Sequence, residues 1–171
     1  SAILTATNAT GVTGTYKAQY ITDANGGYLL FSNEDTRNLV TVARNEYGFE
    51  DATRTYTLTG DENIATDIAN YGDSSYSTDS IGAITDAGAN VTIDGTTTNR
   101  YGINGGTKGG ISVASGQTLT IQTLGSLDSE GAVVKSVNGF STTGNGGVIF
   151  IAGTLNITDS VFSGNSATGN G

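Results

Sequence analysis

Three short segments decide the fold: GANVTI at residues 88–93, GQTLTI at residues 116–121 and GTLNI at residues 153–157. Each begins with a glycine and ends with an apolar residue, a threonine or asparagine, and an isoleucine. This alternation is typical of a β-strand, in which successive side chains point to opposite faces. Each segment is therefore predicted to be a strand with two inward side chains. Together the three strands supply a core column of Val91, Ile93, Leu119, Ile121, Leu155 and Ile157.

A single strand of this length cannot bury its apolar face alone, but similar strands recur along the chain. The apolar positions recur after 28 and then 36 residues, and residues 139–146 match residues 164–171 at a constant offset of 25. Offsets in this range are typical of solenoids, in which each strand stacks on the equivalent strand of the next turn. The sequence therefore predicts an all-β fold, a parallel β-helix. An antiparallel β-sandwich or jelly roll is the alternative, because the offsets are uneven.

The composition agrees with a chain of strands and turns. Of 171 residues, 28 are threonine and 26 are glycine, while 36% are hydrophobic, so helix formers are few but apolar residues suffice for folding. Histidine, cysteine, methionine, proline and tryptophan are all absent. A Ser-His-Asp triad, a thiol nucleophile and a disulfide framework are therefore excluded. The net charge of −9 argues against nucleic-acid binding, and no apolar run is long enough for a membrane-spanning helix.

Charge and aromatic residues divide the chain near residue 80. Residues 1–80 hold most of the acidic and aromatic side chains, and we expect them to form an irregular β cap or a separate β region. Residues 81–171 hold the repeats, which we expect to continue beyond Gly171 in the natural protein. A cap would cover the backbone groups that the first strand of a solenoid leaves unpaired.

Local patterns within residues 1–80 predict individual elements. Asn25-Gly26 indicates a tight hairpin, because this dipeptide adopts positive φ readily. Ile64 and Ile68 lie four residues apart, as on one face of a short helix, although a polar loop is equally compatible with these residues. The predicted elements are a hairpin of residues 16–22 and 28–31, strands at 39–42 and 54–59, and a helix within 61–72.

Two motifs lie near the end of the chain, one at Gly146, Gly147, Val148 and Ile149 and the other at Phe162 and Asn165. They resemble the paired GGA(I/L/V) and FxxN repeats of polymorphic outer-membrane proteins and related autotransporter passenger domains. Val148 departs from the pattern, since the family has alanine there, and residues 1–80 match no repeat. The resemblance implies a right-handed β-helix, exported to the bacterial cell surface, with a structural or adhesive role and no cofactor. Its implied partners are a protein or glycan ligand on a cell surface, or further copies of the chain.

Two other functions are alternatives to adhesion. In a filament subunit, a strand such as residues 2–6 or 12–20 would complete the sheet of a neighbouring copy. In a polysaccharide hydrolase or lyase, a pair of carboxyl groups or a base beside a bound cation would be required. The charged residues of the repeat region form no recognisable catalytic cluster or metal site, so the sequence favours a protein without enzymatic activity. These residues are Asp86, Asp94, Asp128, Glu130, Asp159, Arg100, Lys108 and Lys135.

Overall fold

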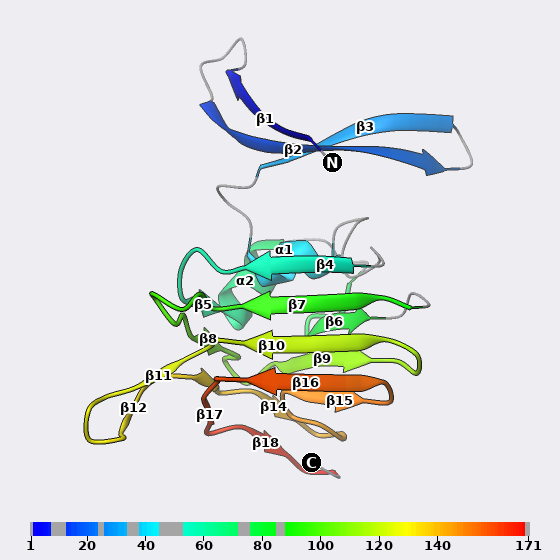
Figure 1. Ribbon diagram of the computed structural model, residues 1–171. Coiled ribbons are helices and arrows are strands. Elements are labelled where there is room, and N and C mark those ends of the chain that lie inside the picture. Colours follow the sequence, from blue (N-terminus) through cyan, green and yellow to red (C-terminus); the bar gives the residue numbers. More distant parts are fainter. Residues whose placement is uncertain are drawn as a thin grey trace. The chain divides into compact units, whose positions relative to one another are not determined.

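The computed structural model describes residues 2–7, 13–23, 26–33, 38–44, 53–71, 76–84 and 88–169. The chain divides into two units, residues 1–37 and 38–171. Within the described residues the structure is mostly β-strand, with two short helices, as the composition predicts (Figure 1).

The first unit contains a three-stranded antiparallel sheet in the order β1-β2-β3. Its strands are β1 (Ala2–Thr7), β2 (Thr13–Asp23) and β3 (Gly26–Asn33). The register pairs Asp23 with Gly26, so β2 and β3 form an antiparallel hairpin, while Asn25 of the predicted Asn-Gly turn lies outside the described residues. The predicted hairpin is confirmed.

The second unit begins with a helix where the sequence predicted a strand. Residues 39–42 lie in α1 (Leu39–Arg44), so the predicted strand is wrong. Asn38 caps this helix, because its Oδ1 accepts a hydrogen bond from the Thr41 backbone N–H at 2.8 Å. Leu39 and Val42, three residues apart, are both buried. The cap and the burial outweigh the strand preference of a β-branched segment.

A second short helix, α2 (Ile64–Tyr71), confirms the prediction for residues 61–72. Its buried residues are Ile64 and Ile68, the pair expected on one face. Asn63 provides the cap, since its Oδ1 accepts from the Thr66 N–H at 3.1 Å. Three strands of the same region are β4 (Thr53–Thr57), which matches the strand predicted at 54–59, β5 (Glu62–Asn63) and β6 (Ser80–Ile84).

The remaining strands are short, and the chain passes from one sheet to the next and then returns to the first. They are β7 (Asn90–Asp94), β8 (Ile103–Asn104), β9 (Gly109–Val113), β10 (Thr118–Gln122), β11 (Ser126–Leu127), β12 (Val133–Lys135), β13 (Val137–Asn138), β14 (Ser141–Thr142), β15 (Ile149–Ile151), β16 (Thr154–Thr158), β17 (Phe162–Ser163) and β18 (Ser166–Ala167).

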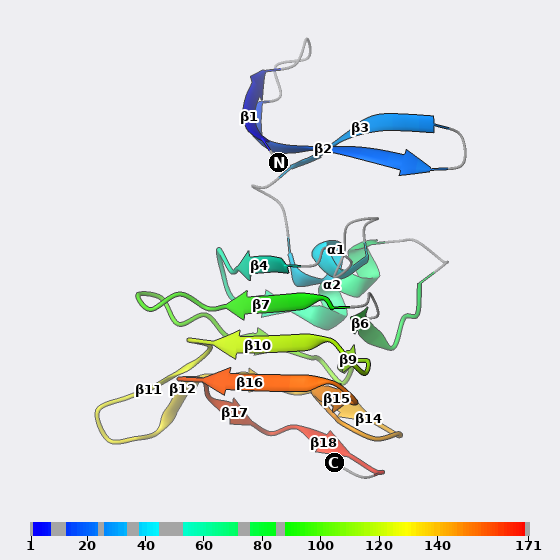
Figure 2. The same cartoon turned by 45° about the vertical axis from the view of Figure 1, so that its right-hand side comes forward.

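Neighbouring strands in these sheets are parallel, apart from the small antiparallel pair β11-β12. The sheets have the orders β4-β7-β10-β16, β5-β8-β13-β17 and β6-β9-β15, with the pair β14-β18 beside them. Figures 1 and 2 show the strands of the second unit stacked layer upon layer in chain order. Because the three- and four-stranded sheets of this unit are parallel, the antiparallel sandwich alternative is wrong for it.

The register aligns the predicted core column. Leu119 of β10 pairs with Val91 of β7 on one side and with Leu155 of β16 on the other, and the isoleucines two residues later align in the same way. The four column residues of β7 and β10 are buried to 3% exposure or less. Leu155 is half-buried, and Ile157 is 49% exposed because no described strand lies beyond β16.

Parallel pairing starts before the boundary expected near residue 80. Thr53–Thr57 pairs in register with β7, and Glu62–Asn63 pairs with β8. The change of composition at residue 80 therefore does not mark the first of the stacked strands. At this end of the stack α1 packs against β6 and α2, and its Leu39 and Val40 are buried to 1% exposure or less.

Candidate functional site

The loops that follow β7, β10 and β16 meet at one edge of their sheet and form an open groove of about 570 Å³. Parallel strands in register bring their carboxyl ends to the same edge, so the loops that leave them lie next to one another. We call this hollow the loop groove. It is lined by Arg100, Ser126, Leu127, Ile157, Asp159, Ser160 and Val161.

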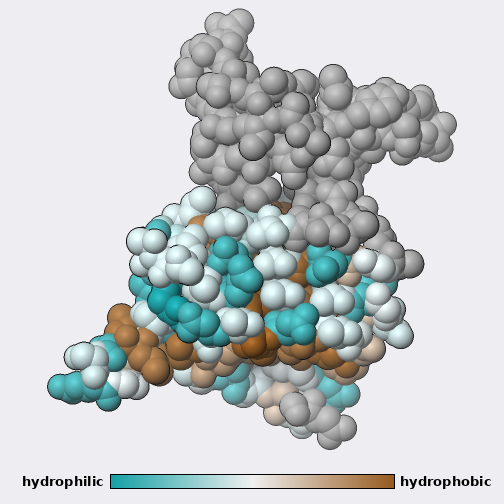
Figure 3. All heavy atoms as spheres, viewed as in Figure 1, coloured by the Kyte–Doolittle hydropathy of each residue, from teal (hydrophilic) through white to brown (hydrophobic). Residues whose placement is uncertain are grey.

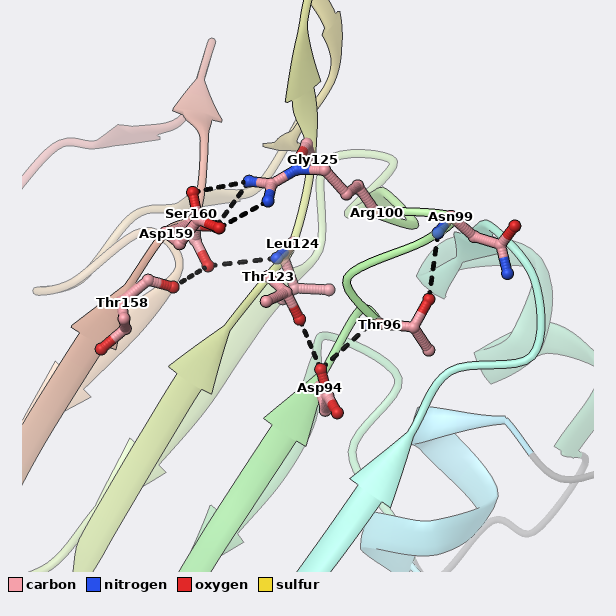
Figure 4. A network of polar contacts seen from close by, with 10 residues as sticks. All are labelled: Asp94, Thr96, Asn99, Arg100, Thr123, Leu124, Gly125, Thr158, Asp159 and Ser160. Carbon is pink, nitrogen blue, oxygen red and sulfur yellow. Dashed lines mark hydrogen bonds and ion pairs between the residues drawn. The ribbon is translucent and has the colours of Figure 1, made fainter.

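Arg100 ties the three loops together (Figure 4). Its Nε donates to the Gly125 carbonyl at 2.7 Å, in the loop after β10. Its Nη1 donates to Asp159 Oδ2 at 2.6 Å, and its Nη2 donates to the Asp159 carbonyl at 2.7 Å. A planar guanidinium suits such a multidentate contact, which fixes the geometry of the loops as well as pairing the charges.

The ion pair sets the charge state of the groove. The hydrogen bond from Arg100 lowers the pKa of Asp159, and the same contact raises the pKa of Arg100. Asp159 is therefore a carboxylate at neutral pH and has no proton to give to a leaving group. In this arrangement it serves to hold the loops, since general-acid catalysis requires a carboxyl group with a raised pKa.

A second set of hydrogen bonds joins the same loops. Asp94 Oδ1 accepts from the Thr96 N–H at 2.9 Å and from the Thr123 hydroxyl. The Leu124 N–H donates to Ser160 Oγ at 3.1 Å. Hydrogen bonds thus join the loops that follow neighbouring strands of this sheet (Figure 4).

Four non-glycine residues of these loops have left-handed backbone angles. Thr96, Arg100, Thr123 and Asp159 have φ of 65°, 47°, 56° and 47°. A β-branched threonine rarely adopts positive φ, so the backbone of two of the loops carries local strain that the hydrogen bonds around it sustain. The sequence alone gave no sign of this feature, because threonine is not a residue that favours such angles.

The charged residues predicted as candidates do not gather at one site. Asp94, Arg100 and Asp159 lie in or beside the loop groove. Asp128 and Glu130 lie on the exposed hairpin between β11 and β12. Lys135 forms an ion pair with Asp61 at 3.1 Å and lies over the Tyr101 ring, Lys108 lies between β8 and β9, and Asp86 is outside the described residues. In the described part of the chain no three acidic residues gather as metal ligands would.

The repeat motif joins neighbouring rows of the stack. Gly147 lies so close to the Ser166 backbone that a β-carbon would overlap its carbonyl oxygen, and Gly146 has φ of 67°. Ile149 pairs with Ile111 in the preceding row, and Val148 packs against the core. The motif glycines are therefore required by a turn and a close backbone approach.

The second half of the motif has an equally direct use. Phe162 pairs with Val137 of β13. Asn165 Oδ1 accepts from the Phe140 N–H at 3.1 Å, and its Nδ2 donates to the Val137 carbonyl at 2.9 Å. The asparagine side chain thus completes backbone hydrogen bonds between two rows, which is a structural role.

Four groove residues were not predicted from the sequence: Ser126, Leu127, Ser160 and Val161. Each of these residues follows a strand of the same sheet, and this was the available signal. Their loops differ in length, however, and in the described part of the chain only the loop after β10 contains a hairpin.

Among the helices of the described residues, neither is long and apolar enough to cross a membrane. The chain matches no family model, no curated protein and no solved structure.

Proposed function

We propose that residues 53–169 form successive turns of a right-handed parallel β-helix, and that this β-helix is an exported adhesive scaffold on a bacterial cell surface. The observation that carries the proposal is the register of β10, which aligns with β7 on one side and with β16 on the other. The chain returns to the same sheet after 28 and then 36 residues, as a solenoid does.

The loops provide the argument for adhesion. In repeat folds the stacked strands form the frame, and insertions gather on one face, which is often the binding face. Here the segment between β10 and β13 is longer than the corresponding segments after β7 and β16, because it contains the hairpin β11-β12. The frame is regular and the variable loops lie at one edge, as expected of a scaffold that displays a binding surface.

The charged groups favour binding over catalysis. Asp159 is paired with Arg100, and Asp94 is bonded to Thr96 and Thr123, so both carboxylates hold the loops in place. The filament alternative receives less support, since Ala2–Thr7 and Thr13–Asp23 are already hydrogen-bonded to each other in the first unit. Donating either strand to a second copy would first require breaking this pairing.

Surface display tests the proposal. The full chain is fused to an outer-membrane anchor in a non-adherent laboratory bacterium, and adhesion is measured to a glycan array and to a panel of immobilised extracellular-matrix proteins. We expect adhesion to one ligand class above the level of the anchor alone. Failure to adhere to any surface, or cleavage of a polysaccharide that is lost in Asp159→Asn, would overturn the proposal.

A further inference from the structure

The hairpin β11-β12 displays apolar side chains to solvent. Among the described residues, three of the six exposed large hydrophobic side chains lie on it: Leu127 at 52%, Val133 at 50% and Val134 at 61% exposure. We call these three residues the hairpin patch. Figure 3 shows hydrophobic residues gathered on the projecting hairpin behind a hydrophilic tip. An exposed apolar cluster with a polar rim is typical of a protein-binding surface.

Hydrogen bonds hold the hairpin in shape. Ser126 pairs with Lys135 and Leu127 pairs with Val133 across the two strands. At the tip, Asp128 Oδ1 accepts hydrogen bonds from the backbone N–H groups of Glu130 and Ala132 at 2.9 and 2.8 Å. At the base, Lys135 is held by Asp61. A patch fixed in this way loses little conformational entropy when a partner binds.

The hairpin patch continues into the loop groove. Leu127 lines the groove together with Ile157 and Val161. Ile157 is itself 49% exposed. A partner seated against the hairpin would therefore have an adjoining hollow for one apolar side chain, which is the arrangement found at energetic centres of protein interfaces.

The charges around the patch favour a basic partner. The two cations beside it are already paired, Arg100 with Asp159 and Lys135 with Asp61. Asp128 and Glu130 are exposed, and within the described residues neither forms an ion pair. The patch thus presents uncompensated negative charge, and the whole chain carries −9. A second copy would bring like charges together, whereas a basic partner would be attracted.

We propose that the hairpin patch and the loop groove bind a protein segment in which apolar side chains alternate with lysine or arginine. This inference rests on the proposed adhesive function and names the class of its partner. The apolar side chains would cover Leu127, Val133 and Val134, and the basic side chains would meet Asp128 and Glu130.

Binding of three short synthetic peptides to the full chain tests the inference, with fluorescence anisotropy at physiological salt as the readout. The first peptide alternates lysine and valine, the second lysine and serine, and the third glutamate and valine. We expect the first to bind at least roughly tenfold more tightly than either of the others, since both apolar contact and charge are required.

Variants locate the site. Val133→Ser combined with Val134→Ser should weaken binding of the lysine-valine peptide by roughly tenfold or more, as loss of an interface centre does. Phe150→Ser is the matched control, because Phe150 is 46% exposed but lies on β15. It should leave binding unchanged. If the double variant melts at a lower temperature than the wild type, Leu127→Ser replaces it.

Three results would overturn the inference: equal binding of the lysine-valine and lysine-serine peptides, no binding of the first peptide, or an equal loss in Phe150→Ser. A concentration-dependent dimer abolished by the double variant would assign the patch to a second copy instead. The surface-display assay separates this test from the proposed function. Adhesion retained by the double variant would leave the scaffold standing while removing the hairpin as its binding site.

Discussion

At the residue scale, burial along the aligned column differs between its middle and its end. Ile121 is 3% exposed with a strand on either side, whereas Ile157 is 49% exposed at the last strand of its sheet. The polar residues between the column positions lie on the opposite face, where Asn156 is exposed and its Nδ2 donates to Thr120 Oγ1 at 3.5 Å. An isoleucine in a middle row is therefore expected to contribute more to the free energy of unfolding than one in the last row.

Alanine substitutions measure this difference. Ile121→Ala should lower the free energy of unfolding by about 2–5 kcal/mol, because it leaves a cavity in a closed stack. Ile157→Ala should cost about 1 kcal/mol, since half of its side chain is already in water. Thr120→Ala and Asn156→Ala should each stay within about 0.5–1 kcal/mol. Urea melts of the four variants check this, and greater sensitivity at Thr120 and Asn156 would show that the inward and outward faces are exchanged.

The Arg100–Asp159 pair predicts a dependence of stability on pH. Because the folded-state pKa of Asp159 is lowered, the pair adds stability above the unfolded pKa of about 3.9 and loses it as the pH falls through the folded pKa. Asp159→Asn should therefore be less stable than the wild type at pH 7 and equal to it in strong acid.

Asp67 supplies a control of opposite sign. Burial raises its pKa, so its contribution is largest below the unfolded pKa and is lost as the pH rises through the folded pKa. Asp67→Asn should consequently gain stability relative to the wild type between acid and neutral pH. Urea midpoints from pH 7 to acid would contradict this account if both variants shifted in the same direction.

At the element scale, strand position was predictable and loop position was not. Two-residue alternation placed the strands that contain Val91, Leu119 and Leu155, because burial of one face requires it. Residues 39–42 misled the prediction, since their β-branched composition hides a capped helix. The loop groove was beyond prediction, because the contact between Arg100 and Asp159 joins residues 59 apart through loops of irregular length.

The motif glycine offers a test at the level of one turn. Gly147→Ala should lower the free energy of unfolding by about 1–3 kcal/mol, because the new methyl group overlaps the Ser166 carbonyl and forces two rows apart. Gly60→Ala is the matched control, since no atom lies within 4 Å of its added β-carbon and its φ is outside the left-handed region. Thermal melts should show the control unchanged or slightly stabilised; equal losses would remove close packing as the reason for the motif.

At the scale of the whole molecule, the two units differ in how their strands pair. The first is an antiparallel sheet of strands adjacent in the sequence, whereas the second pairs strands from distant parts of the chain in parallel. In the second unit α1 packs over the first rows, and the last described strands leave apolar side chains half-buried or exposed. The second unit is therefore covered by a helix at its first rows, whereas β16 leaves an open strand edge among the described residues.

Residues 36 apart in β10 and β16 are direct neighbours in the parallel stack, and an engineered disulfide checks this pairing. The chain has no cysteine, so Thr120→Cys with Asn156→Cys introduces one unambiguous pair. Adjacent strands lie about 4.8 Å apart, within the range that a disulfide spans. We predict rapid cross-linking of this pair under mild oxidation, and little for Thr120→Cys with Thr154→Cys, which is offset by two residues. Preferential cross-linking of the offset pair, or none of the aligned pair, would contradict the parallel in-register stack.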